Sequence, residues 1–250
     1  MQRFTADVSH ELRTPLAALR SVGEVALQRR VNRFEYADAI GSMLEEANRL
    51  TRLIDSLLML SRMDAGHVDL NLAECNVFEV LQQCVTLLDV LAQEKRQSLI
   101  FQSSGDGTIA ADEVLFRYAL INIIHNAIKF TPLAGTIEVH ASGAPSTGVE
   151  ITVDDQGPGI PEESREKIFE RFYRLSPGQT GAGLGLPIAK WIVEAHHGAI
   201  SVSASTSGGS RFTIRLPHQR SDVTSQAASE GRRIEVPFSP VSSLPNSQSL

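Results

Sequence analysis

The chain has 250 residues, of which 42% are hydrophobic, so it can form one large domain or two small domains with their own cores. The formal net charge of -6 disfavours nucleic acid as the main partner, because phosphate backbones are bound by a surplus of Lys and Arg. Two cysteines, Cys75 and Cys84, are too few for a disulfide framework and favour a reducing cytosol. No run of residues approaches the roughly 18 consecutive apolar residues of a membrane helix. We therefore expect the chain as given to be cytoplasmic and to make no membrane contact.

Residues 1–65 are expected to form a helical hairpin. Apolar residues recur at steps of three and four over 2–30 and again over 35–63, as on one face of a helix. The second stripe carries additional leucines and is too wide to be covered by one partner helix. We therefore predict an antiparallel hairpin that joins a second copy in a dimeric four-helix bundle. A hairpin that packs only within its own chain is the alternative.

An α/β domain is predicted for residues 66–217, which makes the fold class α+β. Helices are expected at 76–94, 112–130 and 183–197. Before and between them the sequence has short runs of alternating apolar and polar residues, the first at 68–72. Strands are expected at 135–141, 148–154, 200–204 and 211–216, with residues 143–148 as a turn between the first two. Residues 218–250 are rich in Ser, Gln and Pro without hydrophobic periodicity, and we predict that they are disordered.

His10 is a candidate catalytic residue on the first helix. At 100° per residue it lies about 200° from its neighbours in the apolar stripe, so it faces water. A neutral imidazole can accept a phosphoryl group, and the adjacent carboxylate of Glu11 can orient the ring and take its proton. Taken alone, such a pair is more often an ordinary surface pair. Pro15 cannot donate a helical hydrogen bond, so a kink is expected close to this pair.

Residues 4–16, FTADVSHELRTPL, resemble the phosphoacceptor box of the HisKA class of sensor histidine kinases. The resemblance implies that His10 is autophosphorylated and that Glu11 acts as the base. It also implies that Thr14 helps to position water when the same domain dephosphorylates its partner.

Asn122, Asn126 and Lys129 share one face of the helix expected at 112–130. An amide oxygen is a suitable ligand for Mg²⁺, and an ammonium group complements phosphate charge. The spacing alone would equally suit a polar helix face. Residues 122–132, NIIHNAIKFTP, look like the N box of the same kinases, which implies that Asn126 holds the metal with Asn122 and Lys129 beside it.

Residues 155–160, DQGPGI, follow a predicted strand, so Asp155 is presented at its end. Gly157 and Gly159 allow the backbone to approach a ligand closely, although the segment could also be only a tight loop. The segment is similar to the first glycine box of the kinases. That resemblance implies that Asp155 accepts a hydrogen bond from the adenine amino group.

Residues 181–186, GAGLGL, precede a predicted helix, where backbone amides can bind phosphate. The segment lacks the Rossmann spacing and the Lys-Ser/Thr ending of a P-loop. It looks like the second glycine box, which implies nucleotide contacts by Gly181, Gly183, Gly185 and Leu186. Residues 169–174, FERFYR, resemble the F box that opens the ATP lid, and we assign its aromatic residues a packing role first.

The boxes occur in family order, and the resemblance covers about residues 2–217. It implies a GHKL-type ATPase domain after a dimerisation domain, with ATP and Mg²⁺ as cofactors. It also implies a homodimer that passes the phosphoryl group from His10 to an aspartate of a response-regulator receiver domain, and that can also act as its phosphatase. The parent protein would be membrane-anchored, with this fragment at the cytoplasmic face of the inner membrane.

Two departures from the family leave alternatives open. The lid segment 175–180 is short and lacks the usual basic residue, and the chain opens nine residues before His10 without a sensor region. One alternative is a GHKL ATPase of the chaperone, topoisomerase or mismatch-repair kind. The other is a dimeric scaffold with impaired catalysis.

Overall fold

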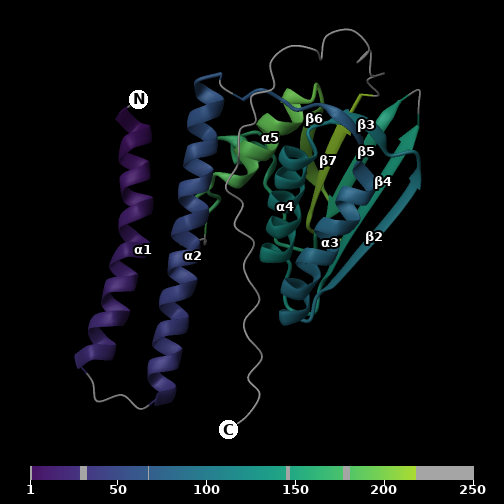
Figure 1. Cartoon of the computed structure of the whole chain (residues 1–250). Helices are drawn as coiled ribbons and strands as arrows, with labels where there is room; N and C mark the ends of the chain where they lie inside the picture. Colours follow the sequence, from purple (N-terminus) through teal and green to yellow (C-terminus); the bar gives the residue numbers. More distant parts are fainter. Residues whose placement is uncertain (1, 29–32, 67, 145–146, 177–180, 218–250) are drawn as a thin grey trace, which may run out of the picture. The chain divides into compact units, whose positions relative to one another are not determined.

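The computed structural model describes residues 2–28, 33–66, 68–144, 147–176 and 181–217 (Figure 1). The expected disordered tail, 218–250, lies outside these residues, as does the part 177–180 of the expected lid.

The two N-terminal helices are confirmed. Helix α1, Gln2–Gln28, continues through Pro15, and helix α2 is Arg33–Asp64. The two pack against each other along their length (Figure 1). Large apolar side chains nevertheless remain exposed on both helices: Leu16, Ile40, Leu44, Ile54 and Leu58. This apolar face is of the kind that a second hairpin would cover. Among the described helices, none is both long and apolar enough to cross a membrane.

The α/β part is built on a five-stranded sheet in the order β2-β4-β5-β7-β6. Its strands are β2 Ser98–Gly105, β4 Thr136–Ala144, β5 Gly148–Asp154, β6 Ala199–Ala204 and β7 Ser210–Leu216. The β2–β4 pair is parallel, with Ser98 opposite Thr136, and the other pairs are antiparallel. Strands β1, Ala73–Asn76, and β3, Thr108–Ala111, form a separate antiparallel pair.

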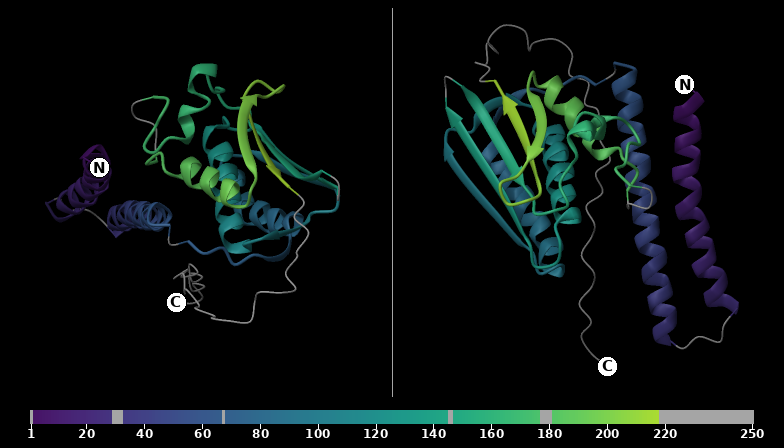
Figure 2. Two further views of the ribbon diagram at one scale, coloured as in Figure 1. Left: turned by 90° about the horizontal axis from the view of Figure 1, so that it is seen from above. Right: turned by 180° about the vertical axis from the view of Figure 1, so that it is seen from behind.

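Three helices cover one face of the large sheet (Figure 2). They are α3 Val77–Glu94, α4 Glu113–Phe130 and α5 Gly185–Ala195, and two short 3₁₀ turns, Glu162–Ser164 and Lys167–Phe169, precede α5. Alternate residues of the strands face the helices, as in β7, where Phe212, Ile214 and Leu216 are buried. The core therefore lies between the sheet and these helices.

The predicted helices and the four predicted strands of this part are confirmed, with ends shifted by a few residues at most. Strand β4 extends to Ala144, into the expected turn, and residues 145–146 of that turn lie outside the described residues. The sequence did not predict β1, β2 or β3, and the alternating run 68–72 forms no strand. Strands β1 and β3 have only four residues each, and the second half of β2 is exposed and polar, so none has an apolar alternation long enough to mark a strand.

Helix α4 is anchored at both ends. At its start the Asp112 carboxylate accepts hydrogen bonds from the backbone N–H groups of Leu115 (3.0 Å) and Asn71 (3.0 Å). The Asp112 N–H in turn donates to Nε2 of buried His196 at 2.9 Å. At its other end Gln97 Nε2 donates to the carbonyl of Thr131 at 2.7 Å. These bonds fix the direction in which the helix presents its polar face.

Replacing Asp112 by Ala should lower the free energy of unfolding of the α/β part by about 1–2 kcal/mol, because α4 loses its N-cap. Asp112→Asn should lose less, since the amide oxygen can still accept from the Leu115 N–H. Denaturant unfolding followed by the fluorescence of Trp191, the single tryptophan of the chain, measures this. Asp69→Ala, at an exposed carboxylate nearby, is the control, and an Asp112→Ala midpoint equal to it would contradict the capping role.

Candidate nucleotide site

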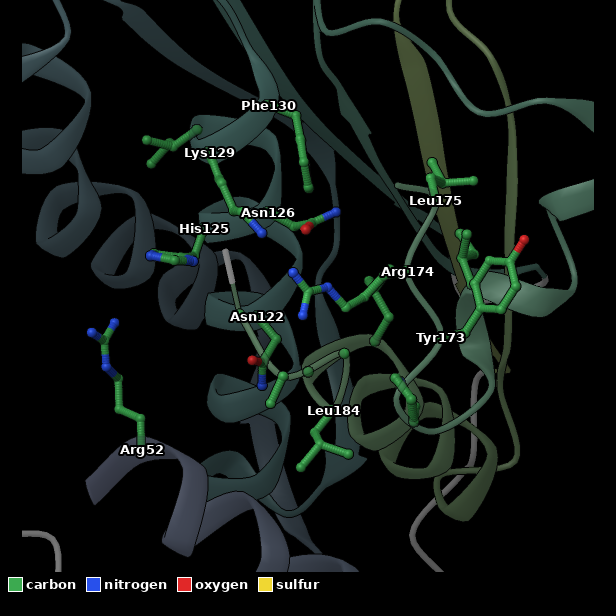
Figure 3. A pocket seen from close by; sticks show the side chains of 18 of the residues that line it. Arg52, Asn122, His125, Asn126, Lys129, Phe130, Tyr173, Arg174, Leu175 and Leu184 are labelled. Atoms are coloured by element: carbon green, nitrogen blue, oxygen red, sulfur yellow. The ribbon is translucent and has the colours of Figure 1, made fainter. Parts of the chain in front are cut away.

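A cavity of about 700 Å³ borders α4, the turn after β5, the segment before the lid and the start of α5 (Figure 3). Its walls include every residue of the glycine and N boxes that the sequence singled out for the nucleotide, except Gly157. These residues are Asn122, Asn126, Lys129, Asp155, Gly159, Gly181, Gly183, Gly185 and Leu186. The structure thus brings together segments that are far apart in the sequence.

Helix α4 supplies the polar wall. Its apolar residues Ile123 and Ile124 are buried in the core, so another face carries Asn122 and Asn126 to the cavity (Figure 3). Asn122 Nδ2 donates to the backbone carbonyl one turn earlier at 3.0 Å, which orients its amide.

Asp155 follows β5 and is buried. Its Oδ1 accepts hydrogen bonds from the N–H groups of Gly157 (2.7 Å) and Ser210 (3.1 Å). Burial raises the pKa of the Asp155 carboxyl above its usual value, and these two bonds oppose that shift. Gly157 does not line the cavity, but a Cβ there would lie 2.8 Å from Asp155 Oδ1 and 3.1 Å from the Phe130 carbonyl oxygen. Its role in the structure is therefore to let the turn close around the carboxylate.

The glycine-rich segment before α5 packs unusually close to its neighbours. Gly183 has a φ of +67°, and a Cβ there would lie 2.8 Å from the carbonyl oxygen of Tyr173. A Cβ at Gly185 would lie 2.6 Å from Asn122 Oδ1. The segment therefore contacts α4 directly, and the first residues of α5 line the cavity, where a helix N-terminus favours an anion.

Positive side chains from four segments line the same cavity: Arg49 and Arg52 of α2, Lys95 after α3, Lys129 of α4, and Arg174. Burial lowers the pKa of Lys129 to about 8, with further lowering by Arg174, Arg49 and Lys95. Lys95 Nζ donates to the carbonyls of Ile128 (2.8 Å) and Lys129 (3.0 Å). The buried Nε of Arg174 has no hydrogen-bond partner among the described residues. The charge balance favours an anionic ligand.

Sequence reasoning did not identify Arg49, Arg52, Lys95 or Arg174 as site residues. Arg174 belongs to the string FERFYR, whose aromatic residues do pack partly buried against the core. Arg174 therefore supplies a basic residue directly before the lid segment 175–180, which itself lacks one. No local signal marks the other three, because only the tertiary structure brings them to the cavity.

Helix α1 meets this site through Glu11. Glu11 and buried Pro15 line the cavity, and Arg174 pairs with the Glu11 carboxylate at 3.5 Å. His10 is exposed and, like Thr14, does not line the cavity. Thr14 Oγ1 donates to the His10 carbonyl at 3.3 Å, so it shares the face of the imidazole.

Two protein families match the chain. Residues 1–66 match the His Kinase A (phospho-acceptor) domain, and residues 111–220 match the histidine kinase-, DNA gyrase B- and HSP90-like ATPase. Among curated proteins, the sensor protein CzcS of Cupriavidus metallidurans is 35% identical over 91% of this chain and 48% of its own length. The chain spans less than half the length of the curated relatives it matches first, between 14% and 48%.

Two solved structures are similar over most of the chain. Full-length ShkA in complex with AMPPNP is 30% identical, with a TM-score of 0.65, over 85% of this chain and 45% of that one. The histidine kinase ThkA in complex with the response regulator protein TrrA is 25% identical, with a TM-score of 0.68, over 87% of this chain and 61% of that one.

The exposed histidine next to an acid on a helical hairpin, the cavity with its cationic walls and the matched families agree in one assignment. The chain belongs to the sensor histidine kinases of two-component signalling.

Proposed function

We propose that the chain binds ATP in this cavity, transfers the γ-phosphoryl group to His10, and passes it to an aspartate of a response regulator. The observation that carries the proposal is that Glu11, next to His10, lines the same cavity as Lys129 and Arg174. Residues 1–65 would act as the dimerisation and phosphotransfer part, and residues 66–217 would bind the nucleotide. AMPPNP in the ShkA complex supports ATP as the ligand.

Each wall of the cavity suits one part of the nucleotide. Asp155 would accept a hydrogen bond from the adenine amino group through Oδ2, because its Oδ1 already accepts from two backbone N–H groups of the protein. The polyphosphate would lie along α4, within reach of the Lys129 side chain and of the N-terminus of α5 at Gly185.

Asn126 is the residue that would hold Mg²⁺, through its amide oxygen. It lines the cavity between Asn122 and Lys129, and a single neutral oxygen suits an ion that keeps most of its ligands from water and phosphate. No group of three or more His, Cys, Asp or Glu that could hold a metal occurs in the described part of the chain. When bound, Mg²⁺ would neutralise part of the phosphate charge.

In the transfer step a ring nitrogen of His10 attacks the γ-phosphorus, the bond to the bridging oxygen breaks, and ADP leaves. Glu11 would take the proton from the other ring nitrogen. Because His10 does not line the cavity, the hairpin and the α/β part must move relative to each other before transfer.

The partners follow from the same assignment. The exposed apolar residues of α1 and α2 support a homodimer, and the ThkA–TrrA complex supports a response-regulator receiver domain as the phosphoryl acceptor. The remaining length of the relatives supports a further sensory region in the parent protein, with this part at the cytoplasmic face of the inner membrane.

Incubation with γ-labelled ATP should give wild-type protein an acid-labile, alkali-stable label. His10→Gln should still bind ATP with unchanged affinity but take up no label, because it lacks the nucleophile. Asn126→Asp should bind ATP at least about tenfold more weakly and take up little label. Hydrolysis without label would favour a GHKL ATPase, and the absence of both would favour a scaffold.

Asp155→Asn should weaken ATP binding without lowering the stability of the protein. With Oδ1 kept on its two N–H donors, the new NH₂ group would replace the acceptor for adenine, so ATP affinity should fall at least about tenfold. The raised pKa of Asp155 means that ionisation of this carboxyl costs stability as pH rises through its folded value. The variant should therefore be as stable as wild type at neutral pH, or more stable. Calorimetric titration and denaturant unfolding measure the two effects, and a loss of both would indicate a purely structural carboxylate.

ATP binding should take up a proton at about pH 8.5, because Lys129 is then largely deprotonated in the free protein and phosphate raises its pKa. Lys129→Arg should bind ATP without proton uptake, since Arg keeps its charge at this pH. Binding enthalpies measured in two buffers of different ionisation enthalpy give the number of protons. Equal uptake by both proteins would show that Lys129 does not respond to the phosphates.

A further inference from the structure

Two arginines of the hairpin lie against the candidate nucleotide site. Arg49 and Arg52 are three residues apart on α2, so they share a face, and both line the cavity. In Figure 3 the Arg52 side chain projects from α2 towards the wall that carries Asn122 and His125. Neither arginine belongs to a motif that the sequence singled out.

Helices α2 and α4 run antiparallel along this wall, and one side-chain contact joins them. Ser56 Oγ lies 3.2 Å from Tyr118 Oη, near the start of α4. One turn back on α2, Arg52 lines the cavity together with His125 of α4 (Figure 3). Another turn back, Arg49 lowers the pKa of Lys129. The remaining residues that we expect to hold the phosphates and the metal, Asn122 and Asn126, lie within this stretch.

Among the described residues, only a backbone group accepts a hydrogen bond from the Arg52 guanidinium. Its Nε donates to the backbone carbonyl of Asn48 at 3.3 Å, and no carboxylate pairs with it in the described part of the chain. Arg49 pairs with Glu46 at 3.3 Å and is about two-fifths exposed. Of Arg49 and Arg52, it is therefore Arg52 whose guanidinium is open to an anion.

The adenine and the phosphates of a bound nucleotide are expected at different levels along α4. Asp155 lies by the C-terminal end of α4, since the turn that holds it packs on the Phe130 carbonyl. The glycine segment meets α4 two turns earlier, at Asn122. A nucleotide with its base at Asp155 would thus extend its phosphates back along α4, towards the level of Arg52.

We propose that Arg52, with Arg49 beside it, binds the terminal phosphate of the nucleotide, so that helix α2 completes the ATP site. This inference rests on the proposed function of the cavity. A planar guanidinium suits a terminal phosphate, because it can donate two parallel hydrogen bonds. The affinity of the α/β part for ATP then depends on where the hairpin places α2.

The test compares AMP, ADP and ATP binding to the full chain by calorimetry at fixed salt. Arg52→Ala should weaken ATP binding about fivefold and AMP binding less than about twofold, because AMP does not reach this residue. The ATP affinity of Arg52→Lys should lie between those of wild type and Arg52→Ala. Arg62→Ala, an exposed arginine of the same helix that does not line the cavity, should leave all three affinities unchanged.

Two outcomes would overturn the inference. Equal weakening of AMP, ADP and ATP by Arg52→Ala would indicate a packing role, and unchanged ATP affinity would indicate no role. Either result leaves the proposed function intact as long as Asn126→Asp still loses ATP binding. Failure of the wild-type chain to bind ATP would instead overturn both proposals. Unchanged Trp191 fluorescence and unfolding midpoint control for folding of the variants.

Discussion

Like-charge repulsion within one cavity is the constraint on which the candidate site depends. Lys129 lies among Arg174, Arg49 and Lys95, and its pKa is lowered first by burial and then by these three charges. Holding the four cations together therefore has an electrostatic cost. The protein offsets this cost only in part, through Glu11 on Arg174, Glu46 on Arg49 and two backbone carbonyls on Lys95. A bound polyanion would relieve the remaining repulsion. The site is thus organised before the ligand arrives, which is what electrostatic stabilisation of a phosphoryl transfer needs.

Helix α4 connects this charge arrangement to the stability of the fold. Its apolar side is in the core, and its ends are fixed by Asp112 and Gln97. The same rotation that buries Ile123 and Ile124 directs Asn122 and Asn126 into the cavity. Changes on the buried side should therefore act through stability, whereas changes on the polar side should act mainly through ligand binding.

The sequence predicted those parts of the fold that rest on local patterns. Helices α1 to α5 and strands β4 to β7 have periodic apolar residues, and the glycine segments have residue types that a close backbone approach requires. Strand β2 escaped prediction because it lies at the sheet edge and its second half is exposed. The sequence also placed the polar face of α4 and the carboxylate Asp155, because each follows from one element alone. It could not place Arg52 or Lys95, since their proximity to α4 exists only in the folded chain.

The segment before the lid connects the two parts of the chain by charge. Arg171 makes two hydrogen bonds to Asp64 at the end of α2, and this contact lowers the pKa of the Asp64 carboxyl. Three residues later Arg174 pairs with Glu11 on α1. Between them Phe172 has a φ of +62°, a costly conformation for a residue other than glycine, and its N–H is held by the Gly183 carbonyl at 3.0 Å. Any anion that enters the cavity competes with Glu11 for Arg174. The pairing of the Glu11 carboxylate, next to His10, and the binding of an anion in the cavity therefore depend on each other through the guanidinium of Arg174.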